Sequence, residues 1–154
     1  MLIWLENTAY SQWILTGLTG WPLVLSMHAI GLATAVGMVF AMNLRLLGLY
    51  TTIPLSSVHG LLNYAWIGIA INVFSGFSLF MTQASFYVTS PPFLVKITAI
   101  IVGIAALVIT QKTLDRELAA GGASGISSKS RNLAVVSLAL WTLAVVTGRL
   151  IAYL

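Results

Sequence analysis

Three side chains capable of polar chemistry lie inside otherwise apolar stretches of this sequence: His28, Lys96 and Arg149. An imidazole accepts or donates a hydrogen bond, and ammonium and guanidinium groups bind anions through charge-assisted hydrogen bonds. Ionisable groups in apolar stretches of membrane-spanning length are costly and indicate functional sites. Because Glu6 is the one acid expected near them, we expect the three to suit an anionic ligand.

The stretches that carry these residues are long enough to cross a bilayer. The 154 residues are 59% hydrophobic and 6% charged, whereas soluble domains are about 25% charged. Hydropathy predicts one transmembrane domain, 1–154, with spans at about 21–49, 54–81, 93–113 and 132–154. Tryptophan and tyrosine in residues 3–17 predict a short interfacial helix. The expected fold is all-α, an integral membrane antiparallel four-helix bundle preceded by that helix.

The distribution of basic residues predicts the orientation of the bundle. One set of span ends carries Arg45, Lys112, Arg116, Lys129 and Arg131. The excess of lysine and arginine on cytoplasmic loops then places both termini on the periplasmic side of a bacterial inner membrane. The connection 114–131 is rich in glycine and serine and is expected to be a flexible cytoplasmic loop.

Depth along the spans, counted at about 1.5 Å per residue, suggests which polar residues converge. His28, Lys96 and Arg149 each lie within roughly two helical turns of the outer surface. The middle to outer half of the second span supplies further polar groups. The expected cofactor-binding set is His28, Lys96, Arg149, Asn72, Ser75 and Tyr153. The alternatives are that His28 only hydrogen-bonds a neighbouring helix and that the cations extend to water or lipid phosphate.

Other metal and haem sites are less favoured. His59 lies near the inner end of the second span, roughly 20 Å from His28, so the two are not expected to ligate one haem iron. A copper(I) site on His28 is the weakest alternative, because adjacent helix positions such as Met27 point in a different direction.

The helix faces also carry packing information. Small residues beside His28, Gly31 and Ala35, are expected to leave space for a ligand. The opposite stripe, Ala29, Ala33, Gly37 and Ala41, is expected to pack closely against another helix. In the third span, Lys96 shares a stripe with Ala99, Gly103, Ala106 and Thr110, which predicts a seam that faces the bundle.

Composition excludes several classes of chemistry. The absence of cysteine removes disulfides, thiolate metal sites and c-type haem attachment. No acid lies inside a predicted span, so no carboxylate pathway for protons or cations is expected. Seven scattered basic residues form no nucleic-acid-binding patch. No hydrolase constellation is visible, and the chain is expected not to be an enzyme on its own.

Three segments carry a resemblance to known membrane proteins: MHAIGLATAVGMVFAMNLRLLGL, SPPFLVK and GRLIAYL. The chain resembles an uncharacterised family of small bacterial four-helix membrane proteins, distantly similar to copper-resistance D type and cytochrome b561-like bundles. The matching positions are His28, Arg45, Lys96, Arg149 and Tyr153. The b-type cytochromes among the distant relatives use several histidines on different spans, whereas this chain has one at the relevant depth.

Two main functions are therefore expected. The first is a small membrane subunit that holds a haem b, a quinone or a similar anionic amphiphile in the outer half of the bundle for electron transfer. The second is a non-catalytic accessory subunit that docks a membrane protein partner or a second copy of itself. A small-molecule or copper transporter is third, since no internal repeat supports it. Besides the lipid bilayer, a partner protein or homo-oligomer is expected, and no nucleic acid.

Overall fold

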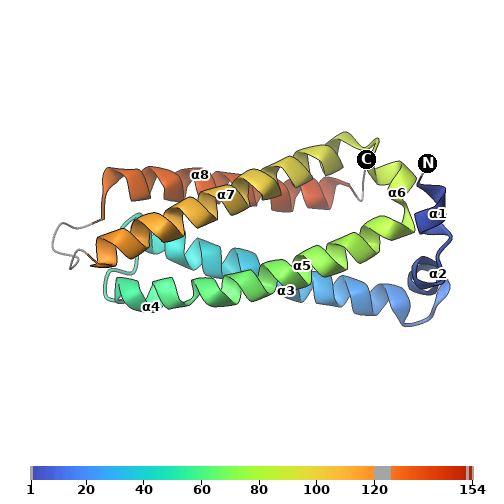
Figure 1. The fold of residues 1–154 in the computed structure, drawn as a ribbon, viewed down its shortest axis with the longest axis horizontal. Coiled ribbons are helices and arrows are strands. Elements are labelled where there is room, and N and C mark those ends of the chain that lie inside the picture. Colours follow the sequence, from blue (N-terminus) through green and yellow to red (C-terminus); the bar gives the residue numbers. More distant parts are fainter. Residues whose placement is uncertain (1, 120–125, 152, 154) are drawn as a thin grey trace.

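The computed structural model describes residues 2–119, 126–151 and 153, and within them the chain is all α-helical. Figure 1 shows a long bundle with short helices gathered at the end where the two termini lie. The helices are α1 (Ile3–Glu6), α2 (Ala9–Thr16), α3 (Gly20–Leu46), α4 (Leu55–Gly60), α5 (Leu62–Thr82), α6 (Ala84–Tyr87), α7 (Pro91–Ala119) and α8 (Ser128–Leu150).

Four helical segments are long and apolar enough to cross a membrane, as hydropathy predicted. They are α3, α4 together with α5, α7 and α8. Proline residues occupy the first positions of α7, where a missing N–H costs no hydrogen bond. The start of α1 and the end of α8 lie at the same end of the bundle, which we call the terminal end (Figure 1). The protein is a multi-pass membrane protein.

The bundle consists of two tightly packed helix pairs. Helix α3 packs along α5, α7 packs along α8, and contacts between α3 and α8 join the pairs. The first pair is close because glycines face each other: a Cβ on Gly68 would lie 2.5 Å from the backbone nitrogen of Ala35. On the other helix, a Cβ on Gly31 would lie 2.8 Å from the backbone nitrogen of Asn72.

The prediction about which face of α3 packs closely against another helix was wrong. The face with Gly31 and Ala35 is the one that packs against α5, and Ala35 also lines a cavity beside His28. The opposite stripe, Ala29, Ala33, Gly37 and Ala41, is exposed, and nothing lies within 4 Å of a Cβ built on Gly37. Both faces carry small residues four positions apart, so the spacing alone did not distinguish the face that meets α5.

The hydrophobic core fills the half of the bundle away from the terminal end. Its fully buried side chains include Val39, Met42, Leu46, Leu62, Leu107 and Leu114. In this half α7 continues to Ala119, so the prediction that 114–131 is a loop was wrong at both of its ends. Leu114 is buried, and the Glu117 carboxylate accepts hydrogen bonds from the hydroxyls of Ser127 and Ser130, which connects α7 to α8. Residues 120–125 of that loop lie outside the described residues.

The N-terminal segment crosses the terminal end as two short helices in place of the single helix expected over 3–17. Thr8 separates them and caps α2, its side chain accepting a hydrogen bond from the backbone N–H of Ser11. Three contacts attach the segment to the bundle. The Glu6 carboxylate accepts from the Ser85 N–H at 2.7 Å, Tyr10 pairs with Ser78, and the Ser11 hydroxyl donates to the Met81 carbonyl.

Candidate functional site

A cavity of about 400 Å³ lies between the two helix pairs, in the half nearer the terminal end. Its wall is formed by α3, α5, α7 and α8 and is mostly apolar. Towards the middle of the bundle it is bounded by Ala35, Ile69, Trp141 and Ala144, and towards the terminal end by Phe77, Phe80 and Phe93. The ionisable or amide side chains in its wall are His28, Asn72 and Lys96. The volume is in the lower part of the range of about 300 to 1,000 Å³ typical of ligand sites.

The cavity opens sideways between α5 and α7. Four of its lining residues are also exposed on the outside of the bundle, with exposed fractions of 57% for Val73, 56% for Phe77, 41% for Val88 and 38% for Ile97. Figure 1 shows α5 and α7 diverging towards the terminal end. In a membrane, this opening faces the lipid acyl chains, so an amphiphile has access from within the bilayer.

His28 is held in one orientation by Ser75, a fully buried residue of α5. The Nδ1 atom of His28 lies 3.0 Å from the Ser75 hydroxyl oxygen. That hydroxyl has a single hydrogen, which it donates to the Ile71 carbonyl at 2.7 Å. The Ser75 oxygen therefore accepts from His28 Nδ1–H. A neutral imidazole carries hydrogen on one nitrogen alone, so Nε2 is the ring atom with a free lone pair.

Asn72 and Gly76 of α5 also contact His28. The Asn72 amide donates to the backbone carbonyl of His28 at 2.9 Å. A Cβ on Gly76 would lie 3.2 Å from His28 Cε1, so glycine at this position makes room for the ring. Of the residues proposed from the sequence, His28, Asn72 and Ser75 thus lie together.

Lys96 brings a positive charge to the same cavity from α7. Its side chain extends over α8 at Gly148, where a Cβ would lie 3.3 Å from Lys96 Cε and 3.4 Å from Nζ. Among the described residues the ammonium has neither a hydrogen-bond acceptor nor a salt-bridge partner. Glu6 is engaged by Ser85 in α6, and the other two acids belong to the far end of α7. The charge is therefore available to a ligand.

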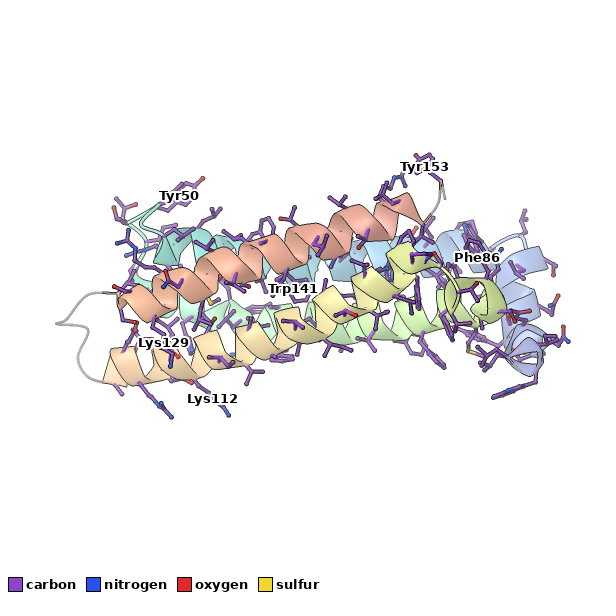
Figure 2. The ribbon with its side chains drawn as sticks, turned by 90° about the horizontal axis from the view of Figure 1, so that it is seen from above. Tyr50, Phe86, Lys112, Lys129, Trp141 and Tyr153 are labelled. Carbon is purple, nitrogen blue, oxygen red and sulfur yellow. The ribbon has the colours of Figure 1, made fainter. Side chains whose placement is uncertain are left out.

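Arg149 and Tyr153, also proposed from the sequence, lie outside the cavity. Both side chains are exposed. They contact each other, with the guanidinium 3.4 Å from the Tyr153 hydroxyl and 5.7 Å from its ring centroid. Figure 2 shows Tyr153 projecting from the end of α8, away from Trp141 near the middle of the bundle. The depth of Arg149 resembles that of Lys96, but its direction around the helix axis differs.

Aromatic side chains also line the cavity. The indole N–H of Trp141, which is 4% exposed, has no hydrogen-bond partner among the described residues. The ring lies over Gly103 of α7, within the seam that the sequence predicted for this helix. At the terminal end, Phe80 stacks on Phe93, and Tyr87 packs against both at a tilt, with ring centroids 5.3 to 6.2 Å apart. No sequence signal indicated that Phe80 and Phe93 share a cavity with His28.

A site shared by the two histidines is not formed. His59 belongs to α4, at the end of the bundle opposite the termini, where its Nε2 lies 2.9 Å from the Asp115 carboxylate of α7. The described residues also contain no group of three or more histidine and acidic side chains placed to hold a metal ion.

Comparison of the chain with protein-family models, with curated proteins and with solved structures gave no match.

Proposed function

We propose that this protein is a small membrane subunit that binds the headgroup of an isoprenoid quinone in the cavity between α5 and α7, as part of an electron-transfer chain. The observation that supports the proposal is that Lys96, whose ammonium is unpaired among the described residues, and His28, which has a free ring nitrogen, line one cavity with a mostly apolar wall. A quinone headgroup offers oxygen atoms to polar partners and presents a flat ring to apolar walls. Its isoprenoid tail would extend through the sideways opening into the bilayer.

Haem b fits this cavity less well than a quinone. A haem carries two propionate carboxylates, whereas one cation, Lys96, reaches the cavity and Arg149 points elsewhere. The described residues also supply one histidine at this depth, while a second axial ligand would have to come from another source. His28 Nε2 remains a suitable ligand for one side of an iron. A haem is accordingly the alternative cofactor for the same site.

The amount of quinone that co-purifies with the protein tests the proposal. Protein purified in mild detergent from cells that contain quinones should yield a quinone on organic extraction, in a fixed ratio to protein. Lys96→Met should bind it more weakly, by about 1.5 to 3 kcal/mol, through loss of a charge-assisted hydrogen bond. Arg149→Met is the matched control, since it removes a cation of similar depth outside the cavity, and should leave the ratio unchanged.

Three results would contradict the quinone proposal. A Soret band in the visible spectrum that disappears in His28→Ala would assign the cavity to haem. Equal loss of quinone in the two cation variants would show that the cations act through surface charge. Protein without quinone that co-purifies with another membrane protein would favour an accessory subunit, for which the exposed small-residue stripe on α3 offers a close-packing face.

We also propose that the protein lies in a bacterial inner membrane with its terminal end at the periplasmic surface. The basic residues that flank the opposite end support this orientation. Single cysteines at Ser85 and Ser128, both exposed and at opposite ends of the bundle, test it. A membrane-impermeant thiol reagent applied to intact cells should label Ser85→Cys and leave Ser128→Cys unlabelled. The reverse pattern would invert the orientation.

A further inference from the structure

The geometry points to a site selective for the reduced quinol, with Ser75 as the positioning residue that presents His28 Nε2 as a hydrogen-bond acceptor. This inference rests on the proposed quinone function and specifies which redox form the cavity prefers. It concerns binding alone and includes no electron-transfer step.

The Ser75 hydroxyl is directed towards the backbone of its own helix. Its hydrogen is used by the Ile71 carbonyl at 2.7 Å, and a second backbone carbonyl, that of Asn72, lies at 3.2 Å. With its hydrogen on that side, where two carbonyl acceptors lie, the serine oxygen accepts from His28 at 3.0 Å. Ser75 is fully buried, so water does not compete for these bonds. His28 therefore offers the cavity an acceptor and no N–H donor.

The opposite polar group of the cavity has the complementary character. Lys96 donates hydrogen bonds and cannot accept them. A ligand that satisfies both groups needs one hydrogen-bond donor and one acceptor oxygen. A quinol has hydroxyls, which both donate and accept, whereas an oxidised quinone has carbonyl oxygens that only accept. Oxidised quinone would pair with Lys96 and leave His28 Nε2 without a partner.

The size of the preference follows from the unpaired acceptor. Leaving one buried acceptor unsatisfied weakens binding by roughly ten-fold, within a range of about five- to 150-fold. A ten-fold preference for quinol raises the midpoint potential of the bound two-electron couple by about 30 mV relative to the free couple. Bound quinol would thus be harder to oxidise than free quinol.

The tautomer of His28 can be measured directly. The chain has two histidines, so ¹⁵N-histidine labelling of the His59→Gln protein leaves His28 as the one imidazole signal. Its nitrogen shifts should report a neutral ring with hydrogen on Nδ1. Hydrogen on Nε2 in the ligand-free protein would overturn the inference, whether or not any Ser75 variant folds.

Binding of decylubiquinol and decylubiquinone to the protein in anaerobic lipid nanodiscs provides the second measurement. We expect the wild type to bind the quinol roughly ten-fold more tightly, and Ser75→Ala to lose most of that ratio. Ser78→Ala is the matched control: Ser78 is also buried on α5, but its hydroxyl pairs with Tyr10 and the Phe74 carbonyl, so the ratio should be retained.

The outcomes separate this inference from the proposed function. If the wild type binds both forms with equal affinity, quinol selectivity fails and the quinone site stands. A ratio that Ser75→Ala retains overturns the positioning role of Ser75. If neither form binds, the quinone site itself is refuted and the inference falls with it.

Discussion

The close contact between α3 and α5 gives the sharpest test of how the site is built. Gly68 and Gly37 are both helical glycines in apolar surroundings, but they differ in what an added Cβ would meet. At Gly68 the Cβ would lie 2.5 Å from Ala35 N and 3.0 Å from Ala35 Cα. Since both atoms belong to the backbone, no side chain can move to relieve the clash. At Gly37 nothing lies within 4 Å.

These distances predict a difference in stability between two otherwise matched variants. Gly68→Ala forces α3 and α5 apart, and overpacking of this kind costs about 1 to 3 kcal/mol. Replacing a helical glycine by alanine also brings up to about 1 kcal/mol of helix propensity, which both variants share. Gly68→Ala should therefore be about 1 to 3 kcal/mol less stable than Gly37→Ala.

Thermal unfolding in mild detergent, followed by intrinsic tryptophan fluorescence, measures this difference. For a chain of this size the midpoint of Gly68→Ala should be roughly 2 to 12 °C lower than that of Gly37→Ala. A bulkier control, Gly37→Leu, should remain close to the wild type, because its side chain enters lipid or detergent. Equal midpoints for Gly68→Ala and Gly37→Ala, or a large loss in Gly37→Leu, would refute the packing derived for α3.

Three further predictions concern polar groups away from the cavity and use the same unfolding assay. Ser137→Ala should cost about 1 to 3 kcal/mol of stability, because it removes the acceptor of the buried Asn43 amide. Asn43→Leu should be nearly neutral, because it also removes a side-chain carbonyl oxygen that has no partner among the described residues. A larger loss of stability in Asn43→Leu than in Ser137→Ala would contradict this prediction. Glu117→Ala should destabilise by more than Asp115→Ala, since Glu117 accepts hydrogen bonds from two hydroxyls within the bundle, whereas Asp115 is more than half exposed and its pair with His59 is worth about 0 to 1 kcal/mol. Similar losses of stability in the two variants would show that the Glu117 hydrogen bonds contribute little. Burial raises the pKa of Tyr87, so the contribution of the neutral phenol to stability is fully present below about pH 10 and is lost as the pH rises through the folded-state pKa. Tyr87→Phe should therefore lose less stability at alkaline pH than the wild type. Identical pH profiles of stability for the two proteins would show that the Tyr87 phenol does not contribute to the alkaline loss.

The sequence predicted the helices and the depth of their residues well. A constant rise per residue is a property of the backbone, so counting along the spans was enough to bring His28, Asn72, Ser75 and Lys96 to one level. Hydropathy likewise predicted the four long segments, although α7 extends to Ala119 because Leu114 is buried and Glu117 bonds to α8.

Direction around each helix axis was the part that the sequence did not determine. Arg149 has a suitable depth, but the buried face of α8 passes through Trp141, Ala144 and Thr147, and Arg149 lies off that face. On α3 two faces carried small residues, and the choice between them depended on Gly68 of α5, a contact between distant parts of the chain. Rotation of a helix is set by such pairings, which the pattern of one segment does not contain.

The sideways opening between α5 and α7 also determines which ligand concentration governs binding to this protein. A ligand that arrives through the acyl chains is confined to a two-dimensional phase, so its supply is the number of molecules per lipid. Diluting vesicles with buffer leaves that number unchanged, whereas adding ligand-free vesicles lowers it. Occupancy would then follow the composition of the membrane, and a site of modest intrinsic affinity would stay filled in any bilayer rich in its ligand.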